Sequence, residues 1–247
     1  NLFHMDNALI GYGKMGKAIE QVALERNHNI VLKISHSNLS AFSESNLRMA
    51  DVAIEFTSPD AALANVLKCL ESGLPVVSGT TGWNRQLNKA KERCVALDGA
   101  FLQTSNFSIG VNLFFEINKQ LAMLMNDWPE YEVRISETHH TEKKDRPSGT
   151  AITLAEQILD NLRQKKHWSE DPENQDPAII PIESFREEHV PGTHQVKYTS
   201  AIDDIEIIHT AHTRKGFAVG AVLAAEFLKN KKGVFSMSDV ILREKLS

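Results

Sequence analysis

The sequence has little cysteine and no long apolar run, and each shortage excludes a class of protein. Cys69 and Cys94 are the only cysteines, and their separation matches no metal-binding or redox spacing. We therefore expect two buried thiols in a reducing compartment. The most apolar stretch, 217 to 228, is shorter than the roughly 18 to 20 residues of a membrane span. No signal-like stretch opens the sequence, so we expect a cytoplasmic protein that does not enter a membrane.

An excess of positive charge is also lacking. The 27 lysines and arginines are outnumbered by 32 acidic residues, which gives a formal charge of -5, and no long basic run offsets it. A general nucleic-acid surface is therefore not expected. A local anion site remains compatible with this charge, because site charges at short range outweigh a distributed net charge. The 247 residues suffice for one large domain or two modest ones.

The first forty residues predict a dinucleotide-binding turn. An apolar run that ends at Ile10 is followed by Gly11-Tyr-Gly13-Lys14-Met15-Gly16, a helical pattern, and a second apolar run that ends at Ile34. In this order, G-x-G-x-x-G indicates a dinucleotide site, although a tight turn without a ligand would use the same glycines. Gly11 permits the turn, Gly13 lets the backbone approach the pyrophosphate, and Gly16 allows close helix packing. We expect Lys14 and Met15 to lie in the same cofactor loop.

The end of the second strand bears on the choice between NADH and NADPH. An acidic residue there would bind the ribose 2′-hydroxyl and repel a 2′-phosphate. The sequence instead reads Lys33-Ile34-Ser35-His36-Ser37. Small hydroxyls beside Lys14 favour NADPH slightly, with Ser35 as a cofactor contact, and dual use stays open.

Further strands are expected over 51–56, 74–78 and 100–104, each followed by a helix or a polar loop. Parallel strands deliver ligand-binding loops at their carboxyl ends. The segment Gly79-Thr80-Thr81-Gly82 is therefore expected to meet the nicotinamide ribose and carboxamide, while Trp83 is interpreted as a packing residue.

The alternation of strands and helices stops after Phe107, which indicates a second domain. A long helix runs to about Met125, strands are expected over 131–138, 178–184, 195–201 and 205–210, and 165–176 is expected to be a surface excursion. An apolar helix over 217–229 and a short strand and helix after Gly233, with Ser238 as a plausible cap, should return to the first domain. We predict an α/β protein with a discontinuous Rossmann-type domain (1–107 and 215–247) and an α+β domain with an open mixed sheet (108–214). Exposed sheet edges favour an oligomer.

The densest group of reactive side chains lies between Glu137 and Thr150. It reads Glu137-Thr-His139-His140-Thr-Glu-Lys143-Lys-Asp-Arg-Pro-Ser-Gly149-Thr150, after a strand pattern and before a helical one. The first N–H groups of a helix attract an anion. A carboxylate substrate could therefore dock on Gly149 and Thr150, facing His139, His140 and Lys143. An exposed polar loop with an ordinary helix cap is the alternative.

The motifs together resemble the family of 4-hydroxy-tetrahydrodipicolinate reductase (dihydrodipicolinate reductase), an enzyme of lysine and diaminopimelate biosynthesis. The resemblance covers nearly the whole chain from Ala8 and is most specific over 137–151, supported by 11–16, 79–82, 105–112 and the segment containing Arg214. It implies NAD(P)H-dependent reduction of a small dicarboxylate in a homotetramer built through the substrate-domain sheets.

The resemblance also implies residue roles. His139 would be the proton donor and Lys143 its catalytic partner, while His140, Gly149 and Thr150 would bind the substrate. Gly79 to Thr81 and the segment Thr104, Ser105, Asn106 and Phe107 would line the nicotinamide. The chemistry fits, because hydride delivery to a conjugated imine leaves an anion that a histidine can protonate near neutral pH. The departures are a shortened glycine loop with Lys14 in place of arginine, a short segment after the second strand, and the missing acidic residue there.

Three other functions are compatible with parts of the sequence. A metal hydrolase could use His139, His140, Glu142, His209 and His212, but adjacent residues of a strand point to opposite faces, and no metal is expected. A nucleotide-sensing protein without catalysis would not need His139 and Lys143. A related amino-acid or imine dehydrogenase would share the architecture and differ in substrate.

Overall fold

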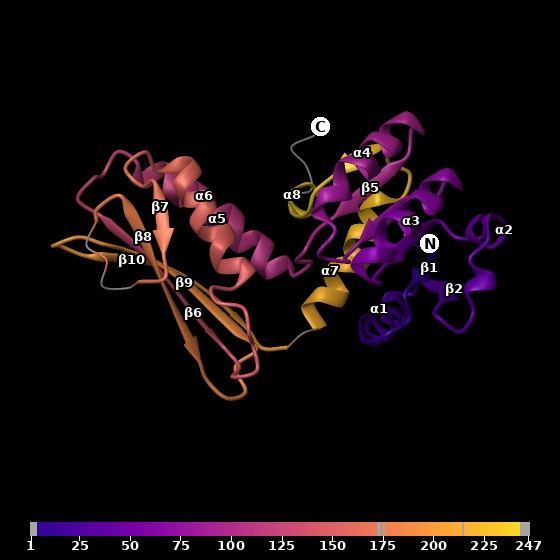
Figure 1. Cartoon of the computed structure of the whole chain (residues 1–247), viewed down its shortest axis with the longest axis horizontal. Coiled ribbons are helices and arrows are strands. Elements are labelled where there is room, and N and C mark those ends of the chain that lie inside the picture. The colour runs from indigo at the N-terminus through magenta and orange to yellow at the C-terminus, as the bar shows by residue number, and fades with distance from the viewer. Residues whose placement is uncertain (1–3, 172–173, 175, 214, 243–247) are drawn as a thin grey trace. The chain divides into compact units, whose positions relative to one another are not determined.

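The computed structural model describes residues 4–171, 174, 176–213 and 215–242. The chain divides into two compact units (Figure 1): a first unit of Asn1–Ile109 with Lys215–Ser247, and a second unit of Gly110–Arg214. The domain boundaries expected from the sequence fell after residue 107 and before residue 215. The first unit is therefore discontinuous in sequence, and the second is inserted between its two parts.

The first unit contains a six-stranded sheet in the order β11-β5-β4-β3-β1-β2, with every neighbouring pair parallel. From β1 the chain crosses to β2 on one side, and from β2 it returns to β3 on the other side of β1, so β1 and β3 flank the point where the strand order reverses. Ligands of such sheets bind beside this point, at the carboxyl ends of the strands. The strands are β1 (Asp6–Ile10), β2 (Asn29–Ile34), β3 (Val52–Glu55), β4 (Val76–Ser78), β5 (Ala100–Gln103) and β11 (Gly233–Phe235).

Helices form an apolar core on each face of this sheet. α1 and α7 supply one core, and α3 and α4 supply most of the other. α7, the gold helix that returns among the indigo and magenta elements in Figure 1, contacts β3, β4 and β5. Its small residues permit this approach, since a side chain at Gly220 would place Cβ 1.7 Å from the carbonyl oxygen of Phe107. The helices are α1 (Lys14–Glu25), η1 (Leu39–Ala41), α2 (Glu44–Leu47), α3 (Pro59–Glu71), η2 (Asn84–Gln86), α4 (Leu87–Ala96), α7 (Lys215–Leu228) and α8 (Met237–Ile241).

The second unit contains a five-stranded mixed sheet in the order β10-β9-β6-β8-β7. β9 is antiparallel to both β10 and β6, whereas β6, β8 and β7 run parallel. Two helices and the inward residues of the strands form one apolar cluster, which includes Phe114, Leu154 and Tyr198. The elements are α5 (Ile109–Met125), β6 (Glu132–His139), α6 (Gly149–Asn161), β7 (His167–Ser169), β8 (Ile179–Arg186), β9 (Gly192–Thr199) and β10 (Asp204–Ala211).

Period-two alternation places the reactive part of β6 on the helix-covered face. Val133 and Ile135 are 1 % exposed and pack in the apolar cluster, and Glu137 and His139 follow at the same spacing. A carboxylate and an imidazole therefore extend the buried face of the strand. Such groups are tolerated only where partners compensate the lost solvation.

The structure confirms the predicted fold class and changes several local expectations. β7 lies inside 165–176, which was expected to be a surface excursion, because residues 167–169 pair with β8. The short α2 was not anticipated, and it buries Leu47. Ser236, rather than Ser238, caps the last helix, since its hydroxyl and the Asp239 carboxylate form a reciprocal capping box.

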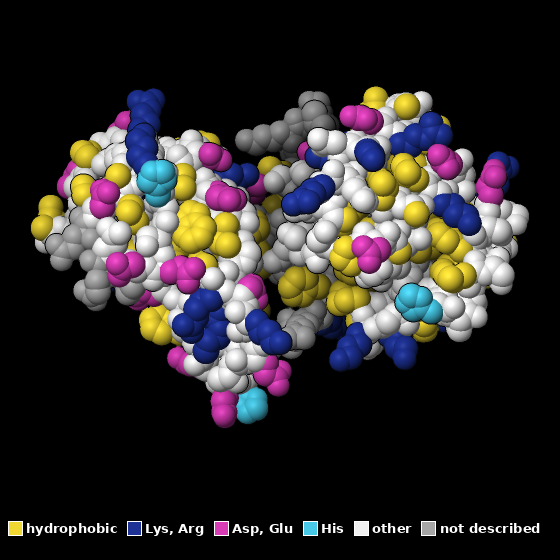
Figure 2. Space-filling model, in the orientation of Figure 1, with side chains coloured by type: hydrophobic (Ala, Val, Ile, Leu, Met, Phe, Trp, Pro, Cys, Tyr) yellow, Lys and Arg dark blue, Asp and Glu magenta, His cyan; other side chains and the backbone are white. Residues whose placement is uncertain are grey.

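Both cysteines are fully buried free thiols, as expected, and burial raises their pKa values. Among the described residues, no helix is both long and apolar enough to cross a membrane. On the face shown in Figure 2, acidic and basic side chains are interspersed over both units.

Candidate active site in two parts

In the first unit, the expected cofactor residues lie in loops that follow neighbouring strands. Gly11 to Gly16 follow β1, Gly79 to Thr81 follow β4, and Thr104 to Phe107 follow β5. β3, which lies between β1 and β4, is followed by Phe56 and Thr57. The sheet therefore arranges these loops in one row at its carboxyl edge, the edge at which such folds bind dinucleotides.

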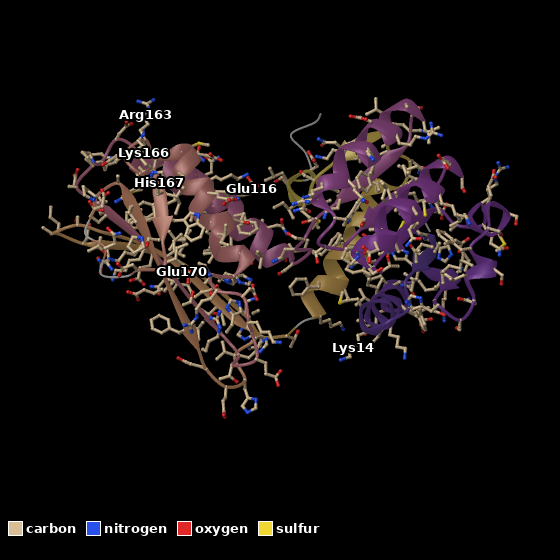
Figure 3. All side chains as sticks on the ribbon, in the orientation of Figure 1. Lys14, Glu116, Arg163, Lys166, His167 and Glu170 are labelled. Atoms are coloured by element: carbon tan, nitrogen blue, oxygen red, sulfur yellow. The ribbon has the colours of Figure 1, made fainter. Side chains whose placement is uncertain are left out.

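The glycine turn has the geometry that a dinucleotide requires. Gly11 has φ +99°, and a Cβ there would lie 1.9 Å from the carbonyl oxygen of Phe56. A Cβ on Gly16 would lie 2.3 Å from the carbonyl oxygen of Gly11, so α1 packs tightly on the turn. At Gly13, which precedes α1, a Cβ would meet no atom within 4 Å. The start of α1 carries no acidic side chain, and Lys14 is exposed there (Figure 3), so this helix end suits an anion.

A buried carboxylate holds the loop after β4. Glu55 is 0 % exposed and accepts hydrogen bonds from the hydroxyls of Ser78 (2.6 Å), Thr80 (2.8 Å) and Thr57. The Thr80 hydroxyl also accepts from the backbone N–H of Thr57 at 2.8 Å. The side chain of Thr80 is thus committed to the protein interior, and the groups that this loop can offer to a ligand are mainly backbone groups and Thr81.

The indole of Trp83 supports the same loop. Its N–H donates to the carbonyl of Thr80 at 2.8 Å, and the ring is 3 % exposed. Close packing also requires Gly79, since a Cβ there would lie 2.2 Å from the ring of Phe56. Trp83 is therefore a packing residue, as expected, and in addition it fastens the loop after β4.

The remaining cofactor candidates lie in two polar turns. The Asn38 side chain accepts from Ser35 N–H at 2.8 Å and donates to the carbonyl of Lys33, which fixes the turn after β2. After β5, the Thr104 hydroxyl accepts from Asn106 N–H, and the Asn106 side chain accepts from Ser108 N–H. The Phe107 ring is buried against Phe56, with ring centroids 5.6 Å apart, so it supports the site from the core. Ser105 is exposed in the turn after β5.

In the second unit, the register of three strands gathers ionisable side chains around Glu137. His194 of β9 lies directly opposite Glu137 of β6, and Arg186 of β8 lies opposite His139. The Glu137 carboxylate accepts from Ser148 N–H at 3.1 Å and contacts the Arg186 guanidinium at 3.4 Å. Its Oε2 lies 3.6 Å from both His139 Nδ1 and His194 Nε2. Glu137 therefore joins β6, β8, β9 and the start of α6.

The surroundings strongly shift the pKa values of Glu137 and His139. Burial raises the pKa of Glu137, but contacts with His194 and Ser148 outweigh it and hold that pKa at about 2. Burial, together with His194, Lys143 and Arg186, lowers the pKa of His139 to about 4, against an opposing contribution from Glu137. In the unliganded protein at neutral pH, Glu137 is charged and His139 is neutral.

The loop after β6 presents the other candidate residues. Lys143 is half-buried, and its ammonium group lies 2.8 Å from both oxygens of Asp145. Arg186 donates to the backbone carbonyls of Lys143 (3.3 Å) and Asp145 (2.7 Å), which anchors the loop. His140 is half-buried, whereas His139 is buried, as expected of adjacent residues at a strand end.

α6 begins where the sequence predicted it. The Ser148 hydroxyl accepts from Ala151 N–H at 3.2 Å, and a Cβ on Gly149 would meet nothing within 4 Å. Within the described part of the chain, the N–H groups of Gly149 and Thr150 have no hydrogen-bond partner. This helix end can therefore bind a carboxylate.

The metal-hydrolase alternative relied on a different set of residues. In the described ranges, potential ligand atoms of Glu137, His139 and His194 lie within 4.8 Å of one another. Of the five residues considered in the sequence, only His139 belongs to this group. Glu137 already has the Arg186 guanidinium and the Ser148 N–H as partners, so its charge is compensated without an ion.

Comparison with known proteins assigns both units to one family. A family model described as dihydrodipicolinate reductase, N-terminus, matches residues 5–107, and one described as dihydrodipicolinate reductase, C-terminus, matches residues 110–241. The chain belongs to the dihydrodipicolinate reductase family. It is accordingly an NAD(P)H-dependent oxidoreductase rather than a metal hydrolase or a nucleotide sensor.

Relatives of the reductase family cover almost the whole chain. The 4-hydroxy-tetrahydrodipicolinate reductase of Christiangramia forsetii is 51 % identical over 241 residues, which cover 96 % of this chain and 98 % of that protein. The enzyme of the same name from Chromobacterium violaceum is 38 % identical, over 78 % of this chain and 73 % of that protein. The dipicolinate-bound dihydrodipicolinate reductase from Paenisporosarcina sp. TG-14 shares the fold, with a TM-score of 0.76 and 22 % identity over 94 % of this chain and 97 % of the other.

Sequence reasoning missed several residues that hold the candidate residues of each unit in place. Glu55, Arg186 and His194 received no role, although Glu55 and Glu137 both stand at buried positions of strands, where a charge demands partners. That demand was visible in the alternation of β6. Arg214, which contributed to the resemblance, lies outside the described residues.

Proposed function

We propose that this chain reduces 4-hydroxy-tetrahydrodipicolinate to tetrahydrodipicolinate with NAD(P)H, as a step of lysine and diaminopimelate biosynthesis. Family membership supports this reaction. The segment from Glu137 to Thr150 is the observation from which we assign roles to individual residues. It combines a buried imidazole, a lysine and an open helix N-terminus in one segment.

The residues fit a reduced nicotinamide dinucleotide, which supplies the hydride when bound. Gly11, Gly13, Lys14, Met15 and Gly16 would hold its pyrophosphate, because the turn is open and the helix end carries no acidic side chain. The groups expected at the ribose and nicotinamide are Ser35, Gly79, Thr80, Thr81, Thr104, Ser105, Asn106 and Phe107. Glu55 and Trp83 hold the nicotinamide loop in place through hydrogen bonds with the hydroxyl and the carbonyl of Thr80.

The second unit would bind and protonate the substrate. The Gly149 and Thr150 N–H groups and His140 would hold its carboxylates, and Lys143 would leave Asp145 to neutralise the charge that develops. His139 would give a proton to the anion left by hydride addition. Because His139 is neutral in the unliganded protein, the two substrate carboxylates must first raise its pKa.

A steady-state assay tests this proposal. The substrate is added to the wild type with NADH or NADPH, and oxidation of the reduced nicotinamide is followed. Lys143→Ala should lose most of kcat with an unchanged circular dichroism spectrum, while Lys166→Ala, at an exposed lysine of the same unit, should leave kcat unchanged. Normal turnover in Lys143→Ala would remove Lys143 from the mechanism, and no turnover in the wild type would refute the proposed reaction.

We also propose a slight preference for NADPH. The turn after β2 presents Ser35 and Ser37 hydroxyls 2.8 Å apart and no carboxylate. In Ser35→Asp, the ratio of kcat/KM for NADPH to that for NADH should fall, because a carboxylate binds the 2′-hydroxyl and repels a 2′-phosphate. An unchanged ratio would place the ribose elsewhere.

A homotetramer in the cytoplasm is the assembly and location we propose. The face of the five-stranded sheet opposite the helices exposes Phe185 and Ile208, at 48 % and 57 %, among polar side chains. Burial against a second copy would remove this apolar surface from water. Light scattering of the wild type and of Ile208→Asp tests it: the variant should dissociate, and a monomeric wild type would refute the proposal.

A further inference from the structure

Glu137 lies behind the proposed proton donor. Its Oε2 is 3.6 Å from Nδ1 of His139, slightly longer than a hydrogen bond. That nitrogen is buried and has no hydrogen-bond partner in the part of the chain that the structure describes. Catalytic hydrogen bonds are often long in unliganded enzymes and tighten when the substrate binds.

We propose that Glu137 is the positioning carboxylate of His139: it receives the Nδ1–H of the imidazole, fixes the tautomer, and stabilises the imidazolium that protonates the substrate. The inference rests on the proposed function for its catalytic meaning. The tautomer itself does not depend on which substrate is reduced.

The carboxylate is held rigidly enough for this role. Both of its oxygens accept from Ser148 N–H at 3.1 Å, and the Arg186 guanidinium contacts Oε1 at 3.4 Å. The cross-strand pairing of Glu137 with His194 sets its position between two imidazoles. The two carboxylate oxygens of Glu137 therefore differ in their surroundings. Oε1 contacts the Arg186 guanidinium, whereas Oε2 faces the imidazole rings of His139 and His194, and both accept from Ser148 N–H. The geometry resembles that of carboxylates that orient histidines elsewhere in enzymes.

The charged groups around His139 explain why a carboxylate is needed. Arg186, Lys143 and His194 all oppose a positive charge on His139, and Asp145 is occupied with Lys143. Glu137 opposes them and favours the imidazolium. Without Glu137, only the two carboxylates of the substrate would favour protonation of His139, while three basic groups and burial would oppose it.

Protons and electrons balance in this scheme. Loss of water from the 4-hydroxy substrate gives a conjugated imine, which then gains the hydride of the reduced nicotinamide at one atom and the Nε2 proton of His139 at another. The nicotinamide is thereby oxidised, and the imidazolium becomes a neutral imidazole that keeps its Nδ1–H toward Glu137. Solvent then returns one proton to Nε2.

Kinetics of Glu137→Gln provide the first test. The substitution keeps size and an acceptor for Ser148 N–H but removes the charge, so kcat at neutral pH should fall about 100-fold, within the range of general acid catalysis. KM should change little. The alkaline limb of the kcat profile, on which activity is lost as His139 gives up its proton, should move about 1 to 3 pH units lower, as expected for loss of an adjacent opposite charge. Glu156→Gln, the same change at an exposed position of α6, is the control and should match the wild type. A fully active Glu137→Gln with an unmoved profile would overturn the proposal.

Nitrogen NMR of the wild type provides a second test that needs neither turnover nor a stable variant at Glu137. Histidine ring nitrogens are labelled, and the His139 signals are assigned by their loss in His139→Gln. At neutral pH, His139 should carry its proton on Nδ1, and dipicolinate should drive the ring toward the doubly protonated form. A ring protonated on Nε2 would overturn the proposal. Inactivity of the wild type with the pathway substrate, beside an Nδ1 tautomer, would refute the proposed reaction and leave the positioning role in place.

Discussion

Acidification should destabilise the second unit through His139. In the folded protein its pKa is lowered from 6.5 to about 4, chiefly by burial and then by His194. Between these values the unfolded chain binds a proton that the folded chain does not. The free energy of unfolding therefore rises with pH across this window: the contribution is complete above pH 6.5 and is lost as the pH falls to about 4.

The size of the effect follows from the difference between the two pKa values. About 2.5 pH units correspond to about 3 kcal/mol, because one unit is worth about 1.4 kcal/mol. Glu137 acts in a lower window. Its folded pKa of about 2 lies below the ordinary 4.5, so its contribution is present above pH 4.5 and lost toward pH 2. Burial also lowers the pKa of His209 in the same unit, so from pH 7 to pH 4.5 it is the difference between the wild type and a variant without His139 that reports on His139.

Urea unfolding of His139→Gln and the wild type at several pH values measures this contribution. Trp128 and Trp168 belong to the second unit, so a common Trp83→Phe background makes the fluorescence report on that unit. The wild type should lose about 2 to 3 kcal/mol more than His139→Gln between pH 7 and pH 4.5. His167→Gln, at an exposed histidine of β7 (Figure 3), should keep the slope of the wild type.

Parallel pH dependences of the wild type and His139→Gln would refute the reasoning. They would mean that the imidazole charges without cost in the folded protein, and hence that His139 is neither desolvated nor opposed by its basic neighbours. In that case the substrate would not need to raise the pKa of His139 before the proton is transferred.

Three further outcomes follow from contacts in the two cores and the glycine turn. Gly11→Ala should abolish binding of NADPH in calorimetry and lower Tm, because the left-handed φ and the 1.9 Å approach to the Phe56 carbonyl leave no room for a methyl group. An affinity equal to that of the wild type would contradict this turn geometry. Glu55→Gln should lower the free energy of unfolding by about 1 to 3 kcal/mol, because an amide N–H₂ would face hydroxyl donors. It should also raise KM for NADPH, and an unchanged KM would mean that Glu55 does not support the nicotinamide loop. Leu154→Ala should cost about 2 to 5 kcal/mol in urea unfolding, whereas Leu124→Ala, at a side chain that is 69 % exposed, should cost far less; equal losses would contradict the assigned core.

Local patterns in the sequence were sufficient for most of the elements, for the glycine turn and for the segment from Glu137 to Thr150. The alternation before Glu137 and the helical spacing after Thr150 located β6 and α6, and the Pro-Ser-Gly-Thr segment marked the cap that Ser148 provides. The glycine pattern predicted a turn whose φ at Gly11 is indeed positive. Each of these features depends on residues close together in the chain.

The partners of the buried carboxylates depend on strand register, which short-range patterns do not contain. Arg186 and His194 reach Glu137 across 49 and 57 residues because β8 and β9 pair with β6 in one particular alignment. A slip of one residue would have turned His194 to the other face of the sheet. β7 escaped prediction for a similar reason, since three residues become a strand only by pairing with β8.

The interrupted layout of the first unit has a consequence for biogenesis. α7 covers β3, β4 and β5, and β11 completes the sheet beside β5, yet both are made only after the inserted second unit. While the ribosome is still adding residues, the amino-terminal strands emerge without the helix that shields one of their faces, and the inserted segment is the first to possess all of its own elements. Folding should therefore finish at the amino-terminal unit rather than begin there, reversing the usual vectorial order.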